Sequence, residues 1–104
     1  MKVRDLLQSW EALELLGRKR LPPEPAVEIA RLLIQTDEIL TQVDAELKQV
    51  VAQYDGTPEK EERVAAIMER NVPLEYQRIS VEELQCSLPP RVLVQLSWLL
   101  DFGR

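Results

Sequence analysis

Histidine is absent from this chain of 104 residues, and cysteine occurs once, as Cys86. Without histidine there is no imidazole to act as a general base, as a metal ligand or as part of a catalytic triad. A zinc site would rest on carboxylates, which that metal rarely uses. One cysteine excludes an internal disulfide and indicates a reducing compartment. We therefore expect no enzymatic activity, no metal and no cofactor.

Glycine is also scarce, because Gly17, Gly56 and Gly103 are isolated and lie far apart along the chain. This spacing excludes a glycine-rich phosphate-binding loop. Apolar runs reach only three residues, as at 32–34 and 98–100, so no membrane span is expected. The first residues lack the apolar stretch of a signal peptide, which predicts a cytoplasmic protein, in the host cell if the gene is phage-encoded.

The charge balance is acidic, with a net charge of −5 and an isoelectric point near 4.8. A nucleic-acid-binding protein normally has a basic face that displaces counterions from phosphates, so nucleic acid is not expected as a partner. Hydrophobic residues make up 45% and charged residues 30%, which is typical of a globular chain. The length predicts one domain over residues 1–104.

Acidic residues occur in adjacent pairs that could in principle bind a divalent cation or transfer protons. Neighbouring side chains on a helix point about 100° apart, so the members of a pair do not converge on one site. We interpret the pairs as solvated helix surface. They are Asp37-Glu38, Glu61-Glu62 and Glu82-Glu83.

The first helix is predicted from Leu6 to about Leu16 by an apolar stripe with spacings of three and four residues. A short extended piece at 2–4 precedes it, and Asp5 is the expected N-cap. Gly17 is expected to end the helix, because a residue with positive φ closes a helix most easily without a Cβ atom.

A long helix is predicted from Ala26 to Tyr54, after a turn rich in proline. Apolar residues recur along it with alternating spacings of four and three, which we call the seam. The seam needs a covering partner, which is either the other helices of the chain or a second copy. Further apolar residues at Val27, Ala30, Ile34 and Val51 widen the stripe and indicate packing on more than one side, particularly in the N-terminal half. The seam comprises Ile29, Leu33, Thr36, Leu40, Val43, Leu47, Val50 and Tyr54.

Asp55-Gly56 predicts a turn into a third helix, which Thr57 caps and which ends near Arg70. Residues 72–79 alternate apolar and polar side chains and contain Pro73, which predicts an edge strand. A lone strand needs a partner. The candidates are residues 2–4 of the same chain and the same segment of a second copy.

A capping box at Ser80-Val81-Glu82-Glu83 predicts a short helical turn that ends near Cys86. The last helix is predicted from about Pro89 to Phe102, with an inner apolar stripe. The tryptophans and tyrosines lie at positions typical of core packing. The sequence therefore predicts a mainly α fold, a small helical bundle on one long central helix with a minor strand pairing.

In their order along the chain, these segments resemble a family of short uncharacterised proteins of tailed phages and prophages. The segments that carry the resemblance are LPPEPAVEIARLL from Leu21, VAQYD from Val51, NVPLEYQRIS from Asn71 and LPPRVLVQLSWLLDF from Leu88. The resemblance implies phage or prophage context and transfers no catalytic or binding residue. The charged insert expected after the long helix is shortened here to residues 55–57.

The leading hypothesis from the sequence is a non-enzymatic protein-interaction or assembly component that forms a homodimer. The alternative is a small acidic regulator that binds and inhibits a host protein, with its acidic surface as a decoy. Aromatic and aliphatic side chains in the second half of the seam and in the extended segment are the candidate interface. These residues are Leu40, Val43, Leu47, Val50, Tyr54, Leu74 and Tyr76.

Overall fold

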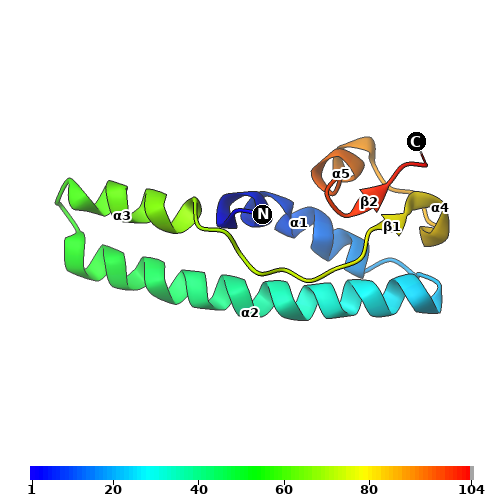
Figure 1. Cartoon of the computed structure of the whole chain (residues 1–104), viewed down its shortest axis with the longest axis horizontal. Coiled ribbons are helices and arrows are strands. Elements are labelled where there is room, and N and C mark those ends of the chain that lie inside the picture. Colours follow the sequence, from blue (N-terminus) through cyan, green and yellow to red (C-terminus); the bar gives the residue numbers. More distant parts are fainter. Residues whose placement is uncertain (104) are drawn as a thin grey trace.

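The computed structural model describes residues 1–103 as a mainly helical fold around one long helix, as the sequence predicts (Figure 1). Two very short strands form a parallel pair near the C-terminus. The elements in chain order are α1 (Val3–Gly17), α2 (Pro23–Tyr54), α3 (Glu59–Met68), β1 (Ile79–Ser80), α4 (Val81–Leu84), α5 (Pro90–Gln95) and β2 (Leu100–Asp101).

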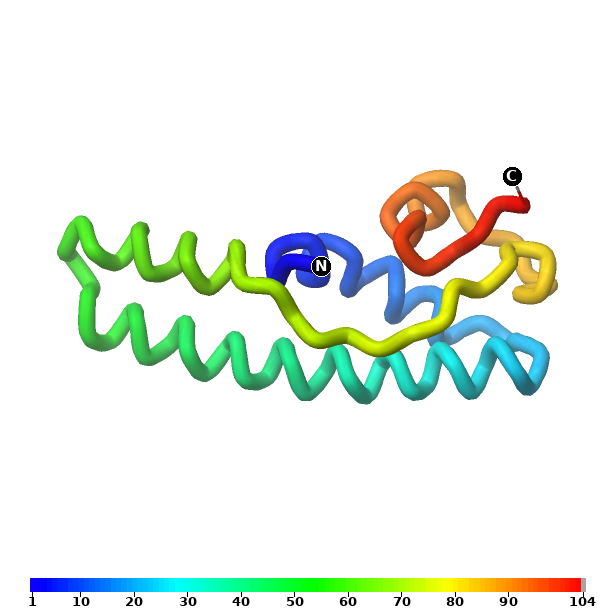
Figure 2. Tube along the Cα trace, in the orientation of Figure 1, coloured from blue at the N-terminus to red at the C-terminus, as the bar shows by residue number. Residues whose placement is uncertain are grey.

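The helices lie in layers along α2, which forms one long edge of the molecule. In Figures 1 and 2, α1 and α3 follow one another over the same side of α2, α1 over its first half and α3 over its second half. The segment with α4, α5 and the strands lies beyond α1. The molecule is therefore elongated, with extents of 49 × 23 × 20 Å.

The start of α1 corrects the sequence prediction of an extended piece at 2–4 capped by Asp5. The helix begins at Val3, with Lys2 as an N-cap residue that makes no side-chain cap bond. The Val3 amide donates to the carbonyl oxygen of Arg70 (2.9 Å), and the buried Val3 side chain anchors the helix. A backbone donor of the first turn is thus satisfied from the end of α3 rather than by a capping carboxylate.

Gly17 ends α1 as predicted, but its backbone is not in the positive-φ region. The last turn is closed by two amides: that of Arg18 donates to the carbonyl oxygen of Leu15 (3.2 Å), and that of Lys19 donates to the carbonyl oxygen of Leu16 (3.1 Å). A glycine is accommodated here for a different reason. A Cβ atom at position 17 would lie 2.8 Å from Cδ1 of Leu33 on α2, so its absence lets α1 approach α2 closely.

The α2–α3 hairpin is confirmed, and α2 begins three residues earlier than predicted, with Pro23 and Pro25 in its first turn. Gly56 has a φ of 77°, which suits a residue without a Cβ atom in the tight turn. Thr57 does not cap α3 as predicted. Its hydroxyl instead donates to the carbonyl oxygen of Tyr54 (2.7 Å), which satisfies the C-terminal end of α2.

Residues 72–78 form an extended segment that takes part in no strand pairing within residues 1–103, which corrects the prediction of an edge strand over 72–79 except at Ile79. At one end Lys2 and Asn71 form an isolated antiparallel bridge, which lies just outside the predicted strand and brings the segment beside the N-terminal residues. In the middle, the Gln35 side chain exchanges two hydrogen bonds with the backbone of Glu75 (2.7 and 2.9 Å). The segment is therefore held against α2 by a side chain.

At its other end this segment becomes β1, which pairs in parallel with β2, Ile79 opposite Leu100. The predicted last helix to Phe102 is thus too long. It ends at Gln95, and residues 96–99 form a turn that brings the chain back to β1. Leu96, Leu99 and Leu100 are buried as predicted, but they lie in a turn and a strand rather than in a helix.

The core lies where α1, the first half of α2 and the C-terminal segment meet. The cluster of buried side chains there contains no residue between positions 34 and 73, and Thr36 and Val43 are buried outside it. The second half of α2 and all of α3 therefore project from the core as a two-helix arm, which comprises residues 40–68. The buried core residues are Ala12, Leu13, Leu16, Ile29, Leu32, Ile79, Leu84, Val92, Leu96, Leu99 and Leu100.

Candidate functional site

The seam of α2 faces the core and α3, and its burial falls along the helix. Ile29, Thr36 and Val43 are buried. The remaining seam residues are half-buried, including four of the predicted interface residues in the arm. Those four are Leu40, Leu47, Val50 and Tyr54.

The arm is thinly packed, since none of the residues of α3 is buried. Val64, Ile67 and Met68 of α3 are half-buried, because a single neighbouring helix cannot enclose them. Most of the stability of a helix in a protein comes from packing of its apolar face. The arm is therefore the part of the molecule with the most to gain from a covering partner.

Ion pairs fix the base of the arm. The Arg70 guanidinium binds the Glu46 carboxylate through two nitrogens, which ties the end of α3 to α2. This hydrogen-bonded guanidinium holds the pKa of Glu46 below its usual value. Glu69 binds Lys2 (2.6 Å) and Arg4 (2.6 Å), and the bond from Lys2 lowers the pKa of Glu69 most. The arm thus has a defined direction relative to α1.

Apolar side chains also occur on the opposite side of α2, away from α1 and α3. Ile34 is 62% exposed and Val27 is 49% exposed, and they lie seven residues apart on one side of the helix. The sequence predicts packing on this side, but in the described chain no element covers it (Figure 1). We call it the outer side of α2, comprising the exposed residues Val27, Ala30, Ile34, Thr41, Ala45 and Ala52.

The two other predicted interface residues lie in the extended segment. Leu74 is half-buried against the core, and Tyr76 is 38% exposed. The Tyr76 ring meets the Trp98 ring edge to face, with centroids 5.0 Å apart. Trp98 is fixed in turn because its indole nitrogen donates to the buried Ser9 hydroxyl (3.0 Å). The structure therefore separates Leu74 and Tyr76 from the arm.

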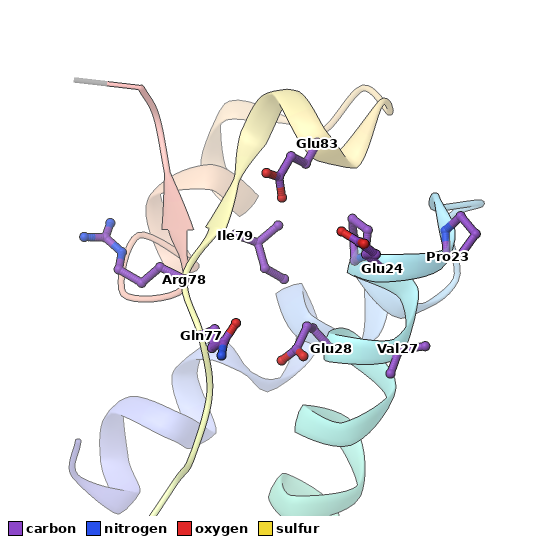
Figure 3. A pocket seen from close by; sticks show the side chains of 9 residues that line it. Pro23, Glu24, Val27, Glu28, Gln77, Arg78, Ile79 and Glu83 are labelled. Carbon is purple, nitrogen blue, oxygen red and sulfur yellow. The ribbon is translucent and has the colours of Figure 1, made fainter.

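A cavity of about 460 Å³ lies between the start of α2, the end of the extended segment and α4. Figure 3 shows the carboxylates of Glu24, Glu28 and Glu83 around the side chain of Ile79. The Arg78 side chain points away from these acids, and its guanidinium donates to the carbonyl oxygens of Ser97 (3.2 Å) and Leu100 (2.7 Å). The cavity is therefore acidic, with an apolar floor.

Residues 1–103 contain no group of three or more acidic, cysteine or histidine side chains placed to hold a metal ion. None of the described helices is both long enough and apolar enough to cross a bilayer. Cys86, the only cysteine, is half-buried beside the core.

Comparisons with known proteins add no relative. No family model matches the chain, no curated protein matches it in sequence, and no solved structure matches it.

The sequence pattern predicts an interface in the second half of the seam, and it predicts that Val27, Ala30 and Ile34 widen the packed stripe of the helix. The available signal was the seven-residue step from Val27 to Ile34 and on to Thr41, which lies on the far side of the helix from Ile29 and Thr36. That step shows a second apolar side. Only the arrangement of α1 and α3 shows that the chain leaves this side uncovered.

Proposed function

We propose that this chain is a non-enzymatic protein-interaction or assembly component of the phage or prophage kind, and that it works by self-association. The observation that carries the proposal is the exposed apolar outer side of α2, where Ile34 is 62% exposed and Val27 is 49% exposed. Large aliphatic side chains in such a position are stabilised when a partner removes them from water.

The thinly packed arm supports the same function. An elongated molecule with its long helix along one edge offers a partner a continuous surface rather than a concave site. Helices associate by packing such an apolar face against another helix. The half-buried seam residues of the arm, Leu47 and Val50 among them, are a second surface that a larger assembly would cover.

The test is a charge placed on the outer side of α2. Ile34→Glu would bury a carboxylate in the interface, so we expect the dissociation constant of the self-associated form to rise at least about tenfold. Ala66→Glu adds the same charge to an exposed position of α3 and is the matched control. Sedimentation equilibrium of the three proteins measures the effect. Equal behaviour of all three would refute self-association through this side.

The alternative function is a small acidic regulator that binds and inhibits a host protein. The net charge of −5 and the acidic cavity beside Ile79 favour it, because such surfaces attract basic partners. A pull-down from host lysate separates the two functions. One stoichiometric basic protein, lost when Glu24, Glu28 and Glu83 are changed to glutamine, would favour the regulator.

A further inference from the structure

We infer that two copies of this chain pack antiparallel along the outer side of α2, with Ile34 of each copy against Ala52 of the partner subunit. This inference rests on the proposed function and adds the partner's orientation and register.

The outer side contains a repeat suited to helix packing. Val27, Ile34 and Thr41 follow one another at seven-residue steps, and Ala45 and Ala52 continue the same side of the helix. All five are exposed. The first half of the repeat therefore carries the larger side chains, and the second half carries alanines that let another backbone approach closely.

A large side chain packs best against a small one, because interdigitation fills the space between two helices. Consider an antiparallel pair in which the two copies of position 43 lie at the same level along the helices. This register places Ile34 against Ala52 of the partner subunit. The same register places Thr41 against Ala45 of the partner subunit. A parallel pair would instead place Ile34 against Ile34 of the partner subunit and leave the alanines facing one another across a gap.

Charge selects the same arrangement. Lys48 and Asp37 lie on the same edge of the outer side, so the antiparallel pair brings Lys48 beside Asp37 of the partner subunit, and symmetry makes this contact twice. In a parallel pair opposite edges meet, so Glu38 would lie beside Asp37 of the partner subunit and like charges would face each other. Lys48 already pairs with Asp44 of its own chain (3.0 Å), which holds the ammonium group on the surface of α2.

Cysteine cross-linking tests orientation and register together. In a background with Cys86→Ser, one sample carries Ile34→Cys and another carries Ala52→Cys. In the inferred pair, position 34 lies opposite position 52 of the partner, within the short Cβ separation that a disulfide needs. Two copies of position 34 lie about 27 Å apart along the axis, at 1.5 Å per residue.

Under mild oxidation we expect the mixture of the two variants to form a covalent dimer and each variant alone to stay unlinked. Self-linking of Ile34→Cys would establish a parallel pair and overturn the inference. A dimeric mass without any cross-link in the mixture would also overturn it, while leaving self-association intact. A monomeric mass for the unmodified protein would refute the proposed function as well.

A charge exchange gives an independent result. Lys48→Glu should weaken self-association about tenfold, because both symmetric contacts become repulsive. Adding Asp37→Lys to the same chain should restore most of the lost affinity. All these positions are exposed, so circular dichroism should show an unchanged fold. Failure of the second change to restore affinity would overturn the register.

Discussion

The Cδ1 atom of Leu33 lies 2.8 Å from the point that a Cβ atom on Gly17 would occupy. This contact sets how closely α1 approaches α2 and therefore how the core between them closes. The atom in the way is the end of a side chain that is only half-buried, so the contact can relax. The two positions are therefore energetically coupled, so the effect of a substitution at Gly17 on stability depends on the side chain at position 33.

Gly17→Ala and Leu33→Ala should therefore be non-additive. Gly17→Ala alone should change the free energy of unfolding by less than about 1 kcal/mol, because a gain in helix propensity offsets the crowding. In the double variant the new methyl group at position 17 fills part of the space left by the shortened side chain at position 33. We expect the double variant to be about 1 kcal/mol more stable than the sum of the single changes predicts. Urea unfolding measures this, and strict additivity would contradict the contact.

Thr36 gives a second prediction, because its hydroxyl is fully buried and has no hydrogen-bond partner among the described residues. Thr36→Val keeps the shape and removes the unsatisfied group, so it should stabilise the fold by about 1 kcal/mol. Thr36→Ser is the matched control, since it keeps the hydroxyl, loses the methyl group and should destabilise. Thermal unfolding of both variants measures the order of stability, and a destabilised valine variant would count against the prediction.

Ser9 links α1 to the C-terminal segment. Its hydroxyl donates to the carbonyl oxygen of Asp5 (2.9 Å) and accepts from the Trp98 indole (3.0 Å). Ser9→Ala leaves the half-buried indole N–H without that partner and should cost about 1–2 kcal/mol of unfolding free energy. Ser87→Ala, at an exposed position, should change it little. If Ser9→Ala leaves the free energy of unfolding unchanged in urea, the hydrogen bond between Ser9 and Trp98 contributes nothing to stability.

The ion pairs of Glu69 predict a pH dependence of stability. Lys2 and Arg4 lower the pKa of Glu69 in the folded state, so this stabilising contribution is complete above the ordinary carboxylate pKa. It is lost as the pH falls through that value and then through the lowered folded pKa. The stability difference between the natural protein and Glu69→Gln should therefore shrink as the solution is acidified.

A pH series of urea unfolding measures that difference, and about 1 M salt should reduce it at neutral pH because the groups are exposed. Glu59→Gln is the matched control, because Glu59 has no ion-pair partner within residues 1–103. A difference that stays constant on acidification would contradict the role assigned to Lys2 and Arg4.

Local signals in the sequence predicted the long helix and its hairpin well. The alternating spacing of the seam needs no tertiary information, and Gly56 marks the turn by itself. The end of the last helix was not predictable in this way. Leu96, Leu99 and Leu100 suit a helix by spacing, but the pairing of Leu100 with Ile79, about twenty residues away in the chain, ends the helix instead.

The interaction surface was predicted only in part, for the same physical reason. The sequence shows two apolar sides of α2, but the placement of α1 and α3 decides which one is covered. Thr36 and Val43 face inward, whereas Val27 and Ile34 remain exposed. Local periodicity identifies the sides of a helix, while long-range packing determines which side meets water.

The most direct test of the central claim is the molar mass of the unmodified protein by light scattering across a concentration series. Self-association through the outer side of α2 predicts a mass near twice 12.0 kDa at high concentration, falling toward 12.0 kDa on dilution. Ile34→Glu should stay near 12.0 kDa under the same conditions. A mass of 12.0 kDa for the unmodified protein at every concentration up to the millimolar range would contradict the claim.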